Sequence, residues 1–169
     1  MEVVQVLERI DANRILREYT EIAARVPWEN GQTSINYRDK EDEDRHLGGC
    51  GWHKELFTRG TSYQEDYTLY NDEYENTLIK GVLEKYGCYR SRLLTRSSGT
   101  CYQWHNDDTF RIHIPVVSDL GNWFAFKEGL HRLELGYVYL VNTTMKHSFF
   151  NGSKTDRIHI VGNTEYEFS

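Results

Sequence analysis

The sequence predicts a mainly β protein with flanking α-helices, and three features lead to that prediction. From residue 89 onward, short segments with strand signals follow one another, separated by turn residues. No helical period interrupts these segments. The first 88 residues instead hold two helical patterns and a long polar stretch. Many short strands at regular spacing, with no helices between them, indicate a β-sandwich or a jelly-roll barrel.

The N-terminal 88 residues are expected to form a helical and loop cover over one sheet. Apolar residues recur with a 3.6-residue period over residues 12–25, after Asp11 as an N-cap. A second helix is predicted from Asn71, with an acidic first turn, to Gly87. The remaining segments are a strand over residues 2–8 and a polar loop over residues 29–66 with one short strand near 33–37.

The C-terminal half is expected to form the core of the fold. No change in composition marks a linker, so residues 1–169 are predicted to be one domain, with the jelly-roll core over residues 89–162. The predicted strands of this core are 91–95, 101–106, 110–117, 123–127, 132–141, 146–150 and 157–161.

Charge and hydropathy exclude several classes of partner. Lys and Arg total 20 against 26 Asp and Glu, a net charge of -6, which argues against binding to nucleic acid or to an anionic membrane. No apolar run approaches the ~20 residues that span a bilayer, and MEVVQVLERID has no signal-peptide character. We therefore expect a cytoplasmic protein that binds neither nucleic acid nor membranes.

The cysteines give a weaker metal signal. Cys50, Cys88 and Cys101 have no paired spacing and are expected to be free thiols in a reducing compartment. His46, Cys50 and His53 could form a zinc half-site with a distant ligand such as Cys88, but there is no CxxC motif. A polar loop is the favoured interpretation.

His105-Asn106-Asp107 is the most informative triplet in the chain. On a strand, residues i and i+2 point to one face, so His105 and Asp107 would present an imidazole and a carboxylate side by side. His147, near the start of a later strand, is the candidate third ligand. Two His and one carboxylate form the facial arrangement of non-haem Fe(II) oxygenases. The alternative is a surface histidine beside acidic residues.

Arg157 supports the metal interpretation. It follows His147 by 10 residues and opens the next predicted strand. A dicarboxylate cosubstrate that chelates iron at one end needs a cation at the other, and a guanidinium offers two parallel hydrogen bonds. The alternative is a salt bridge at a sheet edge, with Asp156 as partner.

These residues together resemble a known family. His105-x-Asp107, RIHIP at residues 111–115 and HSFFNGSKTDRIHI at residues 147–160 resemble the aspartyl/asparaginyl β-hydroxylase-like branch of the Fe(II)/2-oxoglutarate dioxygenases. Bacterial proline cis-hydroxylases are similar members of this branch. The resemblance covers roughly residues 89–162 and implies a double-stranded β-helix, which is a cupin-like jelly roll.

The resemblance also implies roles for six residues. His105, Asp107 and His147 match the iron ligands, and Arg157 matches the arginine that binds the C5 carboxylate of 2-oxoglutarate. The Arg111 and His113 pair matches residues near the cosubstrate. The implied activity is hydroxylation of an unactivated C–H bond in a small amino acid or a peptidyl residue, with Fe(II), 2-oxoglutarate and dioxygen. Because Asp107 is present, hydroxylation is favoured over halogenation.

Two other functional classes stay open at this point. One is a cupin-type protein that binds a small molecule without redox chemistry, and the other is a zinc-dependent cupin enzyme with the same ligands. Candidates for a substrate pocket are Arg92, Arg96, Gln32 and Asn36, each of which could equally be a surface residue or a turn former.

The connection at Asn151-Gly152 decides whether His147 and Arg157 can face the same site. These two residues are a strong signal for a tight hairpin. In that hairpin His147 would lie opposite Asp156, and Arg157 would face away from His147. The oxygenase interpretation requires a wider loop or a corner where the chain passes between two sheets.

Overall fold

The part of the chain that the structure describes holds two larger antiparallel sheets, a two-stranded sheet of β3 and β4, and two α-helices. The computed structural model describes residues 2–40, 43–51 and 63–169. Its strands are β1 (Val4–Arg9), β2 (Gln32–Ser34), β3 (Asn36–Tyr37), β4 (Leu69–Tyr70), β5 (Tyr89–Arg96), β6 (Phe110–Val117), β7 (Asn122–Phe126), β8 (Gly129–His131), β9 (Tyr137–Val141), β10 (His147–Asn151) and β11 (Arg157–Thr164). The helices are α1 (Ala12–Ala23) and α3 (Leu78–Lys85), with short 3-10 turns η1 (Gln64–Asp66) and η2 (Asp72–Tyr74).

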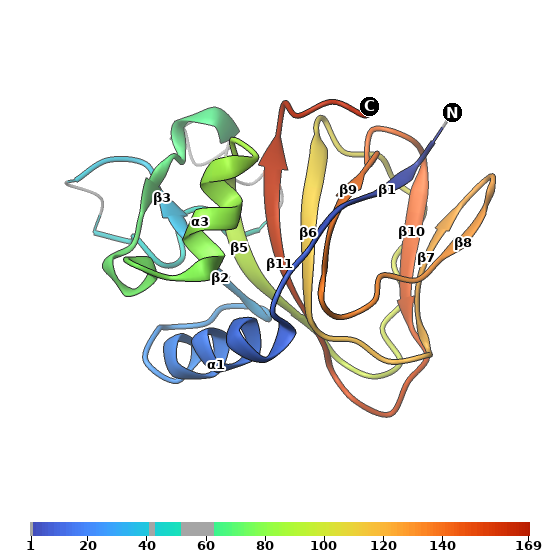
Figure 1. Ribbon diagram of the computed structural model, residues 1–169, viewed down its shortest axis with the longest axis horizontal. Helices are drawn as coiled ribbons and strands as arrows, with labels where there is room; N and C mark the ends of the chain where they lie inside the picture. The colour runs from blue at the N-terminus through green and yellow to red at the C-terminus, as the bar shows by residue number, and fades with distance from the viewer. Residues whose placement is uncertain (1, 41–42, 52–62) are drawn as a thin grey trace.

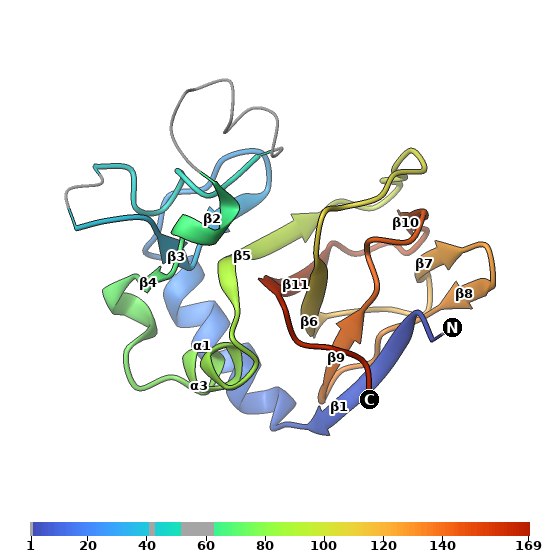
Figure 2. The ribbon, with the colours of Figure 1, turned by 90° about the horizontal axis from the view of Figure 1, so that it is seen from above.

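The sheets form the jelly roll that the sequence predicts. A six-stranded sheet of order β1-β9-β6-β11-β5-β2 faces a three-stranded sheet of order β10-β7-β8 (Figure 1). From β5 onward the chain alternates between the sheets: β5, β6, β9 and β11 belong to the large one, while β7, β8 and β10 belong to the small one. Viewed from above, the two layers enclose a common interior (Figure 2). This alternation defines a double-stranded β-helix.

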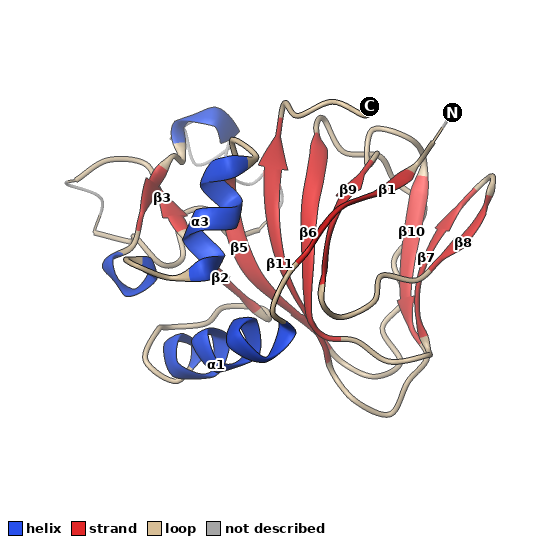
Figure 3. Ribbon diagram, in the orientation of Figure 1, coloured by secondary structure: helices blue, strands red, loops and turns tan. Residues whose placement is uncertain are grey.

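The two faces of the large sheet bury different chemistry. Its outer face packs against the helices through Ile112, Ile114, Leu93 and Ile160. Figure 3 shows α1 and α3 beside this sheet, away from the small one. Each such side chain, when fully buried, contributes roughly 1.5–3 kcal/mol. Its inner face packs on aromatic residues of the small sheet and also carries the polar side chains of the candidate site. The helices contact the outer face and do not cover this inner one.

The first helix follows its prediction, while the second begins later than predicted. The Asp11 carboxylate accepts a hydrogen bond from the backbone N–H of Arg14 and caps α1. The second helix was expected from Asn71, but α3 starts at Leu78. Asn76 lies in the left-handed region at φ 61°, which interrupts the helical path, and the acidic residues before it form η2. Gly87, at φ 58°, ends the helix as predicted.

Three strand predictions need correction. Residues 101–106 form no strand: they meet β10 in isolated bridges at Cys101 and His105 and in hydrogen bonds between Tyr102 and the β10 residues Ser148 and Phe149. Only the second half of the predicted strand 132–141 is a strand: residues 132–136 form none, and β9 begins at Tyr137 after a turn at the left-handed Gly136. The segment 33–37 is divided into β2 and β3 at the buried Ile35. None of the described helices is long and apolar enough to cross a membrane.

The connection after β10 is a corner between the sheets and not a tight hairpin. β10 pairs with β7 in the small sheet, and β11 pairs with β5 and β6 in the large one. The Asn151 side chain holds the corner by donating to the backbone oxygens of Arg96 and Thr155. A Cβ on Gly121 would lie 2.5 Å from the backbone nitrogen of Ser153, so only glycine fits there. The geometric condition for the assigned roles is therefore met.

Glu18 joins the two helices and gives a test of the cover. Its carboxylate accepts hydrogen bonds from the backbone N–H groups of Leu78 and Ile79 at the start of α3. We expect Glu18→Ala to lower the free energy of unfolding, measured in urea, by about 1–3 kcal/mol because these donors lose a charged acceptor. The control is Glu21→Ala on the exposed side of α1. Equal losses in both variants would contradict this role.

Candidate metal centre

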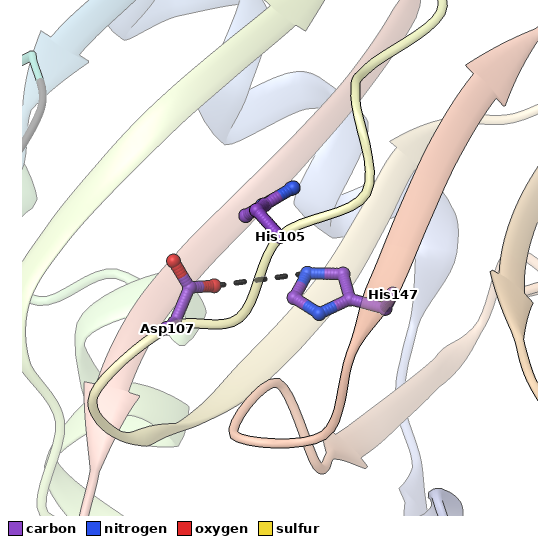
Figure 4. Close-up of side chains that lie close together, drawn as sticks. All are labelled: His105, Asp107 and His147. Atoms are coloured by element: carbon purple, nitrogen blue, oxygen red, sulfur yellow. Dashed lines mark ion pairs between the residues drawn. The ribbon is translucent and has the colours of Figure 1, made fainter.

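The structure brings His105, Asp107 and His147 together. Each offers one ligand atom, and these three atoms lie within 4.8 Å of one another (Figure 4). His105 and Asp107 come from the loop between β5 and β6, and His147 is the first residue of β10. Among the described residues, this is the one group of three or more potential ligands that lie close enough to hold a metal ion.

Local backbone contacts orient both imidazoles. The Nδ1 atom of His105 lies 2.8 Å from the carbonyl oxygen of Gln103, and that of His147 lies 2.9 Å from the carbonyl oxygen of Met145. A carbonyl oxygen only accepts, so each Nδ1 carries the proton and donates. Each Nε2 then carries the ring lone pair, and this tautomer is the form that ligates a metal through Nε2.

Asp107 is held so that one carboxylate oxygen stays available. Its Oδ1 accepts from the guanidinium of Arg111 at 2.7 Å. Its Oδ2 is buried and has no hydrogen-bond partner among the described residues, although it lies 3.7 Å from Nε2 of His147. Burial lowers the pKa of His147, so the imidazole is neutral and forms no ion pair with Asp107. An unpaired buried carboxylate oxygen beside two imidazole lone pairs fits a divalent cation.

Arg157 lies on the inner face of β11, in the aromatic interior. Its guanidinium carbon is 4.1 Å from the ring centroid of Phe149 and 5.2 Å from that of Phe124. Its NH2 group donates to Nδ1 of His159 at 2.7 Å. The side chain is 3% exposed and forms no ion pair with any described carboxylate. The salt bridge with Asp156 that the sequence allowed is not formed.

Arg111 and His113 lie on β6 at two different places in the site. Arg111 holds the candidate metal ligand Asp107. The Nδ1 of His113 is 3.3 Å from Nδ1 of His159, which connects His113 to the surroundings of Arg157. Burial, followed by the charges of Arg157 and Arg111, lowers the pKa of His113 well below its ordinary value, so the ring is neutral. Contact of either residue with a cosubstrate stays a prediction.

The alternative zinc half-site is not assembled among the described residues. His46 pairs with Glu73 at 3.2 Å, while Cys50 contacts the Ser34 hydroxyl. Burial raises the pKa of both Cys50 and Cys88, which disfavours the thiolate that binds zinc. His53 lies outside the described residues.

His159 is a site residue that we did not select from the sequence. It accepts the hydrogen bond that fixes Arg157, and burial lowers its pKa well below the ordinary value, which keeps it a neutral acceptor. The available signal was its i+2 spacing from Arg157, which puts both side chains on one face of a strand. Phe124 and Phe149, which flank the guanidinium, carried no signal beyond their hydrophobicity.

Comparisons with known proteins reveal the fold but no family. No family model and no curated protein matches the chain. A 2OG-Fe(II) oxygenase family oxidoreductase from Burkholderia pseudomallei is 12% identical, at TM-score 0.58, over 97% of this chain and 84% of its own. AviO1 from Streptomyces viridochromogenes Tue57 is 10% identical, at TM-score 0.51, over 99% and 92%. At these identities the likeness establishes a shared fold.

Metal binding can be tested through stability. A divalent cation at a hundredfold excess over its Kd stabilises the folded state by about 2.7 kcal/mol. We expect Co(II) to raise the Tm of the wild-type protein and to leave that of His147→Ala unchanged, because one of three ligands is missing. His131→Ala, which changes a histidine on β8 outside the cluster, should respond like the wild type. An unchanged Co(II) response in His147→Ala would refute the ligand assignment.

Proposed function

We propose that the protein is an Fe(II)- and 2-oxoglutarate-dependent dioxygenase. In this proposal it hydroxylates an unactivated C–H bond of a small amino acid or of an amino-acid residue in a peptide. The donor set of His105, Asp107 and His147 supports the metal, since two imidazoles and one carboxylate on one side suit non-haem Fe(II) and leave the other side for ligands.

The observation that carries the proposal is the environment of Arg157. A guanidinium buried among aromatic rings is costly unless an anion accompanies it, and no described carboxylate does so. It lies over the ring of Phe149, two residues along β10 from the ligand His147, a step of about 7 Å on the same face. A five-carbon dicarboxylate that chelates the metal would place its far carboxylate there.

Each residue then has a defined task. His105, Asp107 and His147 would hold iron, which when bound supplies the activation of dioxygen. Arg157 would bind the far carboxylate in a bidentate manner, and the neutral His159 would fix the orientation of its guanidinium. Phe124 and Phe149 would exclude water, which strengthens this ion pair.

Turnover tests the proposal directly. Free amino acids and short peptides are incubated with Fe(II), 2-oxoglutarate and air, and succinate is measured together with the product mass. We expect one group of related compounds to stimulate succinate release and to gain one oxygen atom. Succinate that never depends on an added compound, with no oxygenated product, would contradict the hydroxylase proposal.

Arg157→Gln tests the cosubstrate site. A charged hydrogen bond contributes about 1.5–3 kcal/mol, so the KM for 2-oxoglutarate should rise about 10- to 100-fold. Arg132→Gln, which removes an arginine paired with Glu134 on the surface, is the control and should leave this KM unchanged. An unchanged KM in Arg157→Gln, with metal binding retained, would eliminate this role.

A further inference from the structure

A second buried guanidinium faces the interior at a different place from Arg157. Arg92 on β5 lies beside Val161 of β11, which in turn lies beside His113 of β6, so the three side chains share one row of the inner face. Arg157 lies four residues before Val161 on β11, where it is opposite Arg96 of β5. The two rows are therefore about 13 Å apart along the strand.

Arg92 differs from its neighbour Arg90 in how its donors are used. Arg90 donates to the backbone oxygens of Gly49 and Gly51 and to Oε1 of Gln64, and all of these contacts are structural. Arg92 is 5% exposed, yet its one hydrogen bond among the described residues runs from NH1 to Oε1 of Gln32 at 3.2 Å. Its Nε is buried without a partner. Arg90 is thus satisfied by the fold, while Arg92 is not.

The surroundings of Arg92 contain too little negative charge. Burial, followed by repulsion from Arg90 and Arg111, lowers the pKa of Arg92 well below the ordinary value. Asp107 is the carboxylate named among the main charges acting on Arg92, and it is already paired with Arg111. The nearby Cys50 is a neutral thiol, because burial raises its pKa. A buried cation that the described residues leave without a paired carboxylate calls for a further anion.

We propose that Arg92, oriented by Gln32, binds the α-carboxylate of the substrate, and that this substrate is a free small amino acid and not an internal residue of a peptide. This inference rests on the proposed function, in which the metal and Arg157 already account for both ends of 2-oxoglutarate. Arg92 is a third position, within electrostatic range of both Asp107 and His113 and four residues along the sheet from the row of Arg157. A planar guanidinium matches a carboxylate through two parallel hydrogen bonds.

Matched acids and amides test the inference without any substitution. Binding of the common amino acids to the Co(II)- and 2-oxoglutarate-loaded protein is measured by calorimetry without oxygen, and each compound that binds is compared with its carboxamide. We expect the acid to bind at least about tenfold more tightly than the amide, since the amide lacks the charge. Equal affinities, no binding by any free amino acid, or a capped peptide that binds as well as the free acid would each overturn it.

Two variants separate this site from the cosubstrate site. Arg92→Gln should reduce the preference for acid over amide to about one and leave the affinity for 2-oxoglutarate unchanged, and Arg92→Lys should be intermediate. Arg157→Gln should do the reverse, weakening 2-oxoglutarate binding while the preference is retained. A preference that survives in Arg92→Gln would refute the inference while leaving the dioxygenase proposal intact. If the wild-type protein does not bind 2-oxoglutarate at all, the dioxygenase proposal alone is refuted. The preference for acid over amide can then still be measured with Co(II) and without 2-oxoglutarate.

Discussion

A pair of backbone hydrogen bonds between His105 and His147 determines the geometry of the candidate site. The N–H of His105 donates to the carbonyl of His147 at 2.9 Å, and the reverse bond is 2.8 Å. This bridge fixes an otherwise irregular loop to the first residue of β10, so two imidazoles from distant parts of the chain lie side by side. Two residues on, the N–H of Asp107 donates to the carbonyl of Thr143 and brings the carboxylate to the same place.

The two faces of the large sheet differ in the side chains that they bury. Its outer face is aliphatic and packs against the helices. The free energy gained by this burial offsets the cost of burying guanidinium groups on the inner face. Its inner face holds Arg92, Arg111 and Arg157, of which only Arg111 pairs with a described carboxylate. Burial of unpaired guanidinium groups opposes folding. Their retention inside a jelly roll is understandable where small anions bind between the sheets.

Regular elements could be predicted from the sequence, while the irregular parts of the site could not. β6 has the predicted bounds of 110–117, because its apolar pattern and flanking turns are local properties. The loop that carries His105 was predicted to be a strand, since its bonds to β10 depend on residues far along the chain. The three side chains that the prediction grouped as ligands nevertheless lie close together. The pairing of Arg111 with Asp107 had no signal, as ion pairs depend on side-chain directions that only the fold determines.

Charge links the metal centre to the two arginine positions. A divalent cation bound at Asp107 would add positive charge to a region that already holds Arg92 and Arg111, where Asp107 is paired with Arg111. Bound anions would offset this repulsion, so metal and carboxylate ligands should each increase the affinity of the site for the other. The net charge of -6 has little bearing on this coupling, because exposed acidic groups are screened by water and salt. The protein is acidic in total, while the inner face of its large sheet carries Arg92, Arg111 and Arg157, so we expect this face, and not the net charge, to set which ligands bind.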